Sequence, residues 1–113
     1  MRSPVPFHVT VEPLDDARLI RAAGELELST APALSQELDE ARDTGATALL
    51  DLADVTFIDS SGLQLLLEAS RQSAESDWAF FIVRTSEAVR RLVELSRTGD
   101  LLTLVDRDAQ PVL

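Results

Sequence analysis

DLADVTFIDSSGLQLLL, residues 51–67, is the stretch that decides the fold of this chain. It continues a nearly unbroken apolar run, Ala48–Leu52, of the kind found in a central strand that is covered on both faces. Its closing leucines recur at helical spacing and predict a helix over about Ser61–Ala74. The polar residues between the strand and the helix include two adjacent hydroxyl side chains, that of Ser60 and that of the first residue of the helix. The question is what role these hydroxyls have.

Apolar periodicity predicts the other elements on both sides of this stretch. Alternation over residues 7–11 is typical of a half-buried strand, and Pro13–Asp16 has the composition of a turn. Gly24 is expected to end the second strand. The expected strands are 7–11, 18–23, 48–52 and 78–83, and residues 101–105 are expected to be a last short strand or an extended tail. The expected helices lie between Thr30 and Gly45, over 61–74, and between Ser86 and Gly99. The order β-β-α-β-α-β-α-β predicts an α/β fold with a mixed sheet and right-handed crossovers.

Composition limits what the chain can do. Its 113 residues suit one domain, and a hydrophobic content of 45% is enough for a real core. The formal net charge of -10 disfavours nucleic acid and anionic membranes as partners. Cysteine is absent, which excludes disulfides and thiolate chemistry, and no apolar run is long enough for a signal peptide or a membrane span. A cytoplasmic, single-domain protein is expected.

The simplest role for the two hydroxyls is a helix cap. The oxygen of Ser60 can accept an N–H of the first helical turn, which contributes roughly 1 kcal/mol, and Asp59 favours the positive end of the helix dipole. Capping leaves Gly62 unexplained, because glycine in a first turn costs up to about 1 kcal/mol relative to alanine. A glycine at this position indicates that something approaches the backbone closely.

Two other roles are possible: a nucleophilic serine, which would react through the hydroxyl, and a phosphate-binding site, which would use the N-terminus of the helix. A nucleophilic serine needs a general base, and the only histidine is His8 in the first strand; the G-x-S-x-G elbow is also missing, because Ile58 replaces its first glycine. A phosphate cradle is possible at any helix N-terminus, but the chain has no glycine-rich phosphate loop and no lysine. The sequence therefore favours neither an enzyme nor a nucleotide site, and it predicts no cofactor and no metal.

A fourth role for a serine at this position is to accept a phosphoryl group. At a helix N-terminus the helix dipole and the backbone donors favour the added charge, so the modification need not disrupt the fold. It adds about −1.5 to −2 charges to one surface position. If that position is a protein interface, repulsion and desolvation would break the complex, and the result is a reversible binding switch.

Three segments resemble one known family. DLADVTFIDSSGLQLLL (51–67) is similar to the signature of the STAS domain of bacterial anti-sigma-factor antagonists, LIRAAGELELSTAPAL (19–34) resembles the family's Gly-Glu-Leu-Asp segment, and SEAVRRLVELSRTGDLLTLV (86–105) resembles its third helix and final strand. The resemblance covers about residues 7–105 and implies one STAS domain over residues 1–113. It also implies a mixed sheet with helices packed mainly on one face, in agreement with the element order.

The resemblance assigns roles to individual residues. It implies that Ser60, the first serine after the aspartate, is the phosphorylation site and that no residue is catalytic. The segment Gly24–Ser29 corresponds to a loop beside the phosphosite that contacts the partner. Two departures are a glutamate, Glu27, where the family has aspartate, and a C-terminus without a further helix. The implied partner-binding residues are Gly24, Glu25, Glu27, Ser29, Asp59, Ser61 and Gly62.

The function implied by the resemblance is partner switching in transcription regulation. The chain would bind an anti-sigma factor that is also a serine kinase and thereby release a sigma factor. Phosphorylation of Ser60 would end the binding, and a serine phosphatase would restore it. The alternative is a STAS scaffold module of a stress-signalling complex or of a lipid-transport ATPase, without sigma-factor control. A monomer or weak dimer is expected.

Overall fold

The computed structural model describes residues 6–102 and residue 104. Its elements are β1 (His8–Pro13), β2 (Ala17–Leu26), α1 (Ala31–Thr44), β3 (Thr47–Ile58), α2 (Ser60–Glu75), β4 (Phe80–Thr85), α3 (Glu87–Ser96) and a short 3-10 helix η1 (Gly99–Leu101). The order confirms the predicted succession of strands and helices up to α3. None of the described helices combines the length and the apolar character that a membrane crossing requires.

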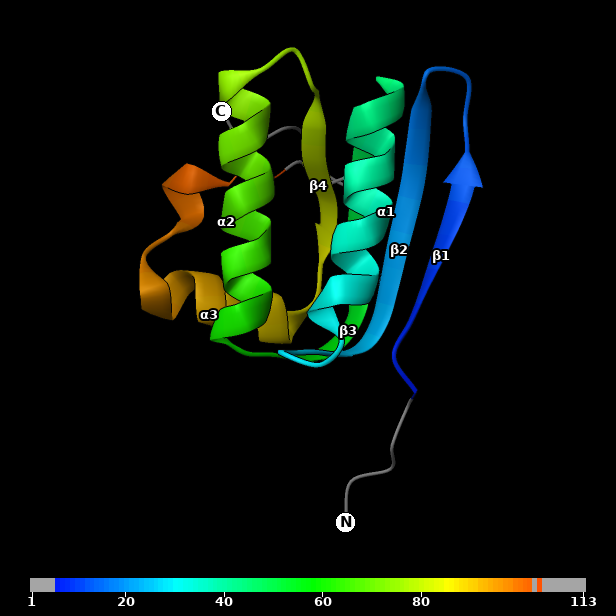
Figure 1. Cartoon of the computed structure of the whole chain (residues 1–113). Coiled ribbons are helices and arrows are strands. Elements are labelled where there is room, and N and C mark those ends of the chain that lie inside the picture. The colour runs from blue at the N-terminus through cyan, green and yellow to red at the C-terminus, as the bar shows by residue number, and fades with distance from the viewer. Residues whose placement is uncertain (1–5, 103, 105–113) are drawn as a thin grey trace.

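The four strands form one sheet in the order β1-β2-β3-β4. β1 and β2 are an antiparallel hairpin, whereas β2–β3 and β3–β4 are parallel pairs. Parallel neighbours need a crossover, and α1 and α2 supply the two crossovers here. Figure 1 shows both helices lying side by side over one face of the sheet, with α3 at the end where β3 finishes. This arrangement confirms the mixed sheet with helices mainly on one face.

The core lies between β2, β3 and the two covering helices. Ile20 of β2 pairs with Leu50 of β3, and both are fully buried. Burial of one such side chain contributes about 1.5–3 kcal/mol. The helix face predicted for α1 is the buried one: Leu34, Leu38 and Ala41.

Two of the predicted helix boundaries are confirmed. Gly45 follows α1 in the left-handed region, with a φ of 76°, and its N–H bonds to the last turn. Ser86 caps α3, and its Oγ accepts the N–H of Val89 at 3.2 Å. Thr30 is the N-cap residue of α1 but makes no side-chain capping bond; its hydroxyl donates instead to the carbonyl of Glu25 at 2.6 Å.

Two of the predicted boundaries are wrong. Gly24 does not end β2: its φ of 99° produces an irregularity in the pairing with β3, and the strand continues to Leu26. Gly99 does not end α3, which finishes at Ser96 because Arg97 takes the left-handed conformation, with a φ of 58°. A positive φ therefore interrupts regular structure at both places, but only one of the two residues is glycine.

The segment 101–105, expected to be a short strand or an extended tail, forms only an isolated strand bridge within its described residues. Leu101 belongs to η1, and Leu104 makes an isolated parallel bridge with Ile82 of β4. Residues 103 and 105 lie outside the described part of the chain. The strand predicted over 78–83 is displaced to Phe80–Thr85. Trp78 precedes the strand, and its indole Nε1 donates to the carbonyl of Ala46 at 3.1 Å.

A carboxylate lies buried in the middle of the sheet. Asp51 of β3 is only 5% exposed, and its Oδ2 lies 3.6 Å from Nε of Arg21 on β2 and 3.7 Å from Nη1 of Arg84 on β4. Its Oδ1 accepts the backbone N–H of Ala53 at 2.9 Å. The pairing of β3 shifts register here on both sides. The side chain therefore satisfies a backbone donor at an irregularity where the regular ladder is interrupted.

Candidate functional site

The candidate site lies where β3 passes into α2. Asp59 is the N-cap residue of α2, and its Oδ1 accepts the backbone N–H groups of Ser61 at 2.9 Å and Gly62 at 3.1 Å. The prediction that Ser60 is the cap is therefore wrong. An aspartate in this position satisfies two of the orphan donors and places a negative charge at the positive end of the helix.

Ser60 is the first residue of α2, one position earlier than predicted, and its side chain is exposed. Its hydroxyl makes no hydrogen bond to any other residue that the structure describes. Ser61 is half-buried and is the second helical residue. The two adjacent hydroxyls thus differ in accessibility, and only that of Ser60 faces solvent unhindered.

Gly62 is buried, and other residues of the same chain leave no space for a side chain at this position. A Cβ at this position would lie 2.8 Å from Cγ1 of Ile58, 2.9 Å from Cγ of Leu26 and 3.0 Å from the Leu26 carbonyl oxygen. Real Cβ contacts are essentially never so short. The sequence predicts a close approach to this glycine correctly, but the approaching groups belong to the ends of β2 and β3 and not to an incoming protein.

The segment Gly24–Ser29 lies beside the start of α2. Leu26, at the end of β2, pairs with Ile58, and its carbonyl accepts the N–H of Asp59 at 3.2 Å. The predicted proximity of this segment to Ser60 therefore holds. Gly24, Glu25 and Leu26 belong to β2, however, and only the residues from Glu27 onward form the loop.

The side chain of Glu27 is used inside this loop. Its Oε1 accepts the backbone N–H of Ser29 at 2.9 Å and also accepts a short hydrogen bond from the Ser29 hydroxyl. The backbone N–H of Glu27 donates to Oγ1 of Thr30 at 2.9 Å. The carboxylate of Glu27 therefore hydrogen-bonds within its own loop. Its contact with a partner, like those of the other predicted partner-binding residues, stays a prediction.

Two exposed apolar side chains near Ser60 are absent from the predicted set. Leu28, in the loop after β2, is 73% exposed, and Phe57, near the end of β3, is 42% exposed. Leu28 stands between two polar loop residues, which is a signal that the sequence carries. The exposure of Phe57 could not be predicted from alternation, because Thr56 and Phe57 are both exposed before the buried Ile58. Leu28 and Phe57 lie at or just beyond the paired ends of β2 and β3, and they add exposed apolar surface at this end of the sheet.

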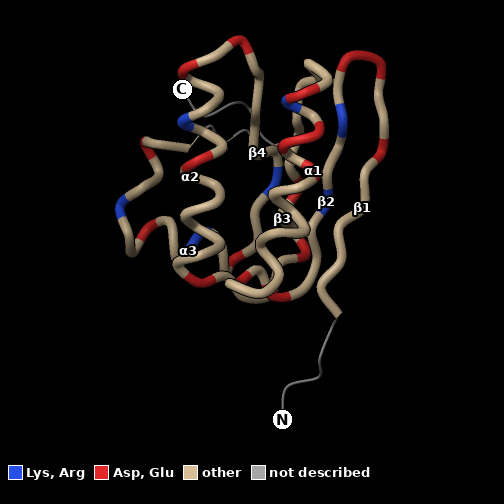
Figure 2. The backbone as a smooth tube through the Cα atoms, viewed as in Figure 1, with Lys and Arg blue, Asp and Glu red and all other residues tan. Residues whose placement is uncertain are grey.

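Within the described residues, the groups that a nucleophilic serine needs are not arranged around Ser60. His8 lies on the edge strand β1, two strands away from β3, and its Nδ1 lies 3.2 Å from the carbonyl of Pro6. In the described part of the chain no hydrogen bond links Ser60 to a base, and no group of His, Cys, Asp or Glu side chains is arranged to hold a metal ion. Figure 2 shows acidic segments along the loops at this end of the sheet. An exposed hydroxyl beside carboxylates and apolar side chains can be modified and can bind a protein.

Comparisons with known proteins agree on the family. A family model described as "Mlab, STAS domain" matches residues 9–105. The chain is 30% identical over 89 residues to an anti-sigma-B factor antagonist of Staphylococcus epidermidis, a match that covers 78% of this chain and 82% of the relative. Among solved structures, an anti-sigma factor antagonist from Mycobacterium paratuberculosis is similar with a TM-score of 0.78 and 25% identity, over 93% of this chain and 90% of that one.

A further solved structure supports the fold alone. The Bacillus cell fate determinant SpoIIAA in its phosphorylated form matches with a TM-score of 0.67 and 21% identity, over 89% of this chain and 94% of that one. The region that the family model matches contains nearly all of β1 and every further element to α3, with the D-S-S-G segment at the start of α2. The chain therefore belongs to the STAS-domain family, the family of the bacterial anti-sigma-factor antagonists.

Proposed function

We propose that this chain is an anti-sigma-factor antagonist that is switched by phosphorylation of Ser60. In its unmodified form it binds an anti-sigma factor with serine kinase activity and so releases a sigma factor. The observation that carries the proposal is the exposed Ser60 hydroxyl, free of hydrogen bonds within the described residues, at the start of α2 in a STAS-domain chain. The relatives named as anti-sigma factor antagonists support the same role.

Phosphoryl transfer at this position needs only an accessible oxygen. The partner kinase would transfer the γ-phosphoryl group of ATP to Oγ of Ser60, with loss of the hydroxyl proton and release of ADP. A serine phosphatase would hydrolyse the ester and regenerate the hydroxyl. The chain itself supplies the acceptor and no catalytic group.

The cap on α2 explains how the phosphate would act. The N–H groups of Ser61 and Gly62 are already bound by Asp59, so a phosphate on Ser60 finds those two donors occupied. It would remain at the surface, next to the Asp59 carboxylate, with about −1.5 to −2 added charges. A partner that covers Ser60 would then have to desolvate this charge cluster. The expectation that free backbone donors would favour the phosphate is therefore not met at these two groups, and the switch acts through the charge that it adds at the interface.

We further propose that residues 1–113 form a single STAS domain with its core at about 7–105. One cluster of buried side chains runs through the described strands and helices, which supports one hydrophobic core. The alternative function is a STAS scaffold in a stress-signalling complex or a lipid-transport ATPase. The family match favours both functions equally, because it identifies the domain and not the partner.

The decisive experiment is capture of a kinase-type anti-sigma factor by the purified chain, followed by incubation with labelled ATP. We expect Ser60→Ala to bind the partner but to accept no phosphate, and Ser60→Asp to lose binding. Ser76→Ala is the matched control, because Ser76 is an exposed serine at the opposite end of α2, and it should bind and be labelled like the wild type. Equal labelling of Ser60→Ala and wild type would show that the site is wrong. Capture of transporter subunits without any anti-sigma factor would favour the scaffold.

A further inference from the structure

Strand β3 extends well beyond its neighbour β4. The pairing of the two strands ends at Leu52 with Thr85, whereas β3 runs on to Ile58. From Ala53 onward β3 keeps β2 on one side, but on the other side no strand pairs with it within residues 6–102 and 104. This side is an open strand edge of about 20 Å, at about 3.3 Å per residue. Open edges present backbone donors and acceptors that can pair with another chain.

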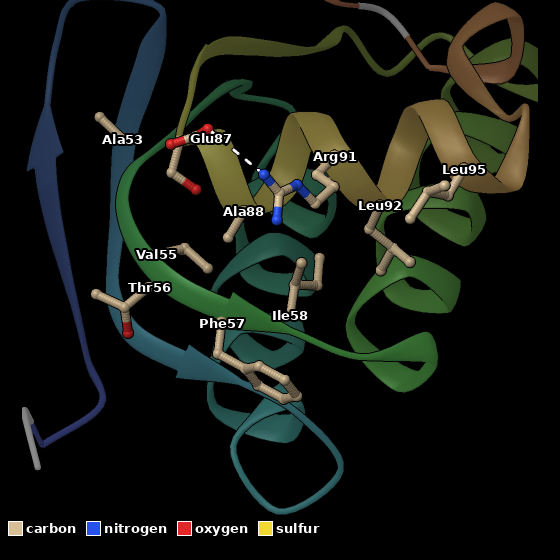
Figure 3. Close-up of a pocket in the computed structure, with 11 residues that line it drawn as sticks. Ala53, Val55, Thr56, Phe57, Ile58, Glu87, Ala88, Arg91, Leu92 and Leu95 are labelled. Atoms are coloured by element: carbon tan, nitrogen blue, oxygen red, sulfur yellow. Dashed lines mark ion pairs between the residues drawn. The ribbon is translucent and has the colours of Figure 1, made fainter. Parts of the chain in front are cut away.

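Helix α3 lies next to this edge and turns it into a groove. The groove has a volume of about 640 Å³ and runs between residues 53–58 of β3 and the facing side of α3. Ala88, Leu92 and Leu95 contribute to that side and follow helical spacing along α3. Figure 3 shows Ala88 and Leu92 on the side of α3 that faces Val55 and Ile58, with Leu95 further along the helix. We call it the β3–α3 groove.

The chemistry of the β3–α3 groove fits an uncharged, apolar segment. The lining contains one cation, Arg91, and one anion, Glu87, which form an ion pair at 3.7 Å (Figure 3). Both are more than 70% exposed, so the pair contributes little to stability, but it leaves the lining without net charge in a chain with net charge -10. Leu95, which is 76% exposed, and Phe57 add apolar surface at the rim.

The groove is continuous with the surface around Ser60. Phe57 and Ile58 line its end, and Asp59 and Ser60 follow them directly in the chain. A stable protein complex buries about 800 Å² on each partner, which takes roughly 20–30 residues a side. The exposed residues at the start of α2 and in the loop after β2 are far fewer than that. An interface centred on Ser60 must therefore extend onto neighbouring surface, and the groove is the apolar surface that adjoins it.

We infer that the β3–α3 groove binds an extended, apolar segment of the same anti-sigma factor, which adds a strand to the free edge of β3. The inference rests on the proposed function for the identity of the partner. Strand addition beside a helix uses main-chain hydrogen bonds for affinity and side-chain pockets for selectivity. A segment of about six residues would match the free edge from Ala53 to Ile58, with alternate side chains turned toward the leucines of α3.

The test compares binding of the captured anti-sigma factor to full-length variants. Leu95→Asp places a charge at the rim of the groove, and Ala88→Arg fills it; each is expected to weaken binding about tenfold or more. Leu14→Asp is the matched control, because Leu14 is an exposed leucine in the turn between β1 and β2, and it should bind like the wild type. Circular dichroism and thermal unfolding verify that all three variants fold.

Amide hydrogen exchange separates strand addition from a general apolar contact. In the complex, amides within residues 53–57 are expected to exchange at least tenfold more slowly than in the free chain. If the partner binds, and Ser60→Asp abolishes the binding, while the groove variants bind normally and these amides are unaffected, the groove inference is wrong and the proposed function stands.

If no anti-sigma factor binds at all, the proposed function fails, and the groove is tested by selection of a displayed library of random decapeptides on the full chain. Selected peptides with alternating apolar residues, whose binding Ala88→Arg removes and Leu14→Asp does not, would support a strand-binding groove. Selection of no such peptides would overturn it.

Discussion

Leu26 and Gly62 pack backbone against backbone, so closely that a Cβ on Gly62 would lie 3.0 Å from the carbonyl oxygen of Leu26 and 2.9 Å from its Cγ. Leu26 is fully buried, and its carbonyl also holds the N–H of Asp59 at 3.2 Å. The start of α2 is therefore fixed to the end of β2, and the proposed phosphosite and the loop after β2 form one rigid surface.

The first prediction concerns this contact. Gly62→Ala should destabilise the fold by about 1–3 kcal/mol, the range for overpacking, although alanine is the better helix former by up to about 1 kcal/mol. Urea unfolding measures the change. Gly99→Ala is the matched control, because its Cβ would meet only Cγ1 of Val93 at 3.6 Å, and it should change stability by less than about 0.5 kcal/mol. Equal stability of the two variants would contradict the close packing.

The second prediction concerns the cap of α2. Asp59→Ala removes the acceptor for the N–H groups of Ser61 and Gly62 and should cost about 0.5–2 kcal/mol of stability. Asp59→Asn keeps a side-chain oxygen and should lose only a small part of this. Urea unfolding of the three proteins distinguishes them. If Asp59→Ala were as stable as the wild type, the two capping hydrogen bonds would contribute nothing and the assignment of the cap would be wrong.

The third prediction concerns the buried carboxylate of Asp51. Asp51→Ala leaves the N–H of Ala53 without its acceptor and should cost about 1–3 kcal/mol. Asp51→Asn keeps an oxygen for that N–H but loses the charge that faces Arg21 and Arg84, so its loss should be smaller. Chemical denaturation gives the ranking. Equal losses for the two variants would show that the ion pairs, which both variants lack, matter more than the backbone hydrogen bond.

The fourth prediction concerns pH. The side-chain hydrogen bond from Arg71 holds the pKa of Glu68 below its ordinary value of 4.5. A lowered pKa stabilises the fold at pH values above 4.5, and this contribution disappears as the pH falls through the folded-state pKa. Arg71→Ala should therefore raise the pKa of Glu68 toward 4.5, as measured by carboxyl NMR titration. Arg90→Ala is the control, because Arg90 lies on α3, and it should leave the titration of Glu68 unchanged.

Most of the fold could be predicted because the apolar periods are strong. The spacing of Leu34, Leu38 and Ala41 predicts the buried face of α1, and the run Ala48–Leu52 predicts a buried central strand. The length of β3 could not be predicted from its apolar run alone. Beyond Leu52, β3 still pairs with β2 but is no longer continuously buried, and polar residues interrupt its apolar sequence. The apolar run therefore marks only the first half of the strand.

The site could be placed by its sequence motif, but its internal roles could not. Asp59 and Ser60 are both good capping residues, and only the backbone conformation decides that Asp59 is the cap. The buried state of Gly62 depends on Leu26, which is distant in the sequence. The open edge of β3 depends on where β4 stops, which is a property of the sheet and not of any one segment.

The position of Asp51 has a further consequence for folding. The side chains of a strand alternate between its two faces, so a slip of β3 by one residue would turn this carboxylate to the helix-covered face, away from Arg21 and Arg84. An unpaired charge buried there would be far more costly than any apolar mismatch. The neighbours of Asp51 in β3 are mostly small or branched apolar residues, which distinguish one register of the strand from the next only weakly. Asp51, the first residue of the DLADVTFIDSSG segment, thus disfavours misaligned sheets and so helps to fix where Ser60 lies relative to the end of β2.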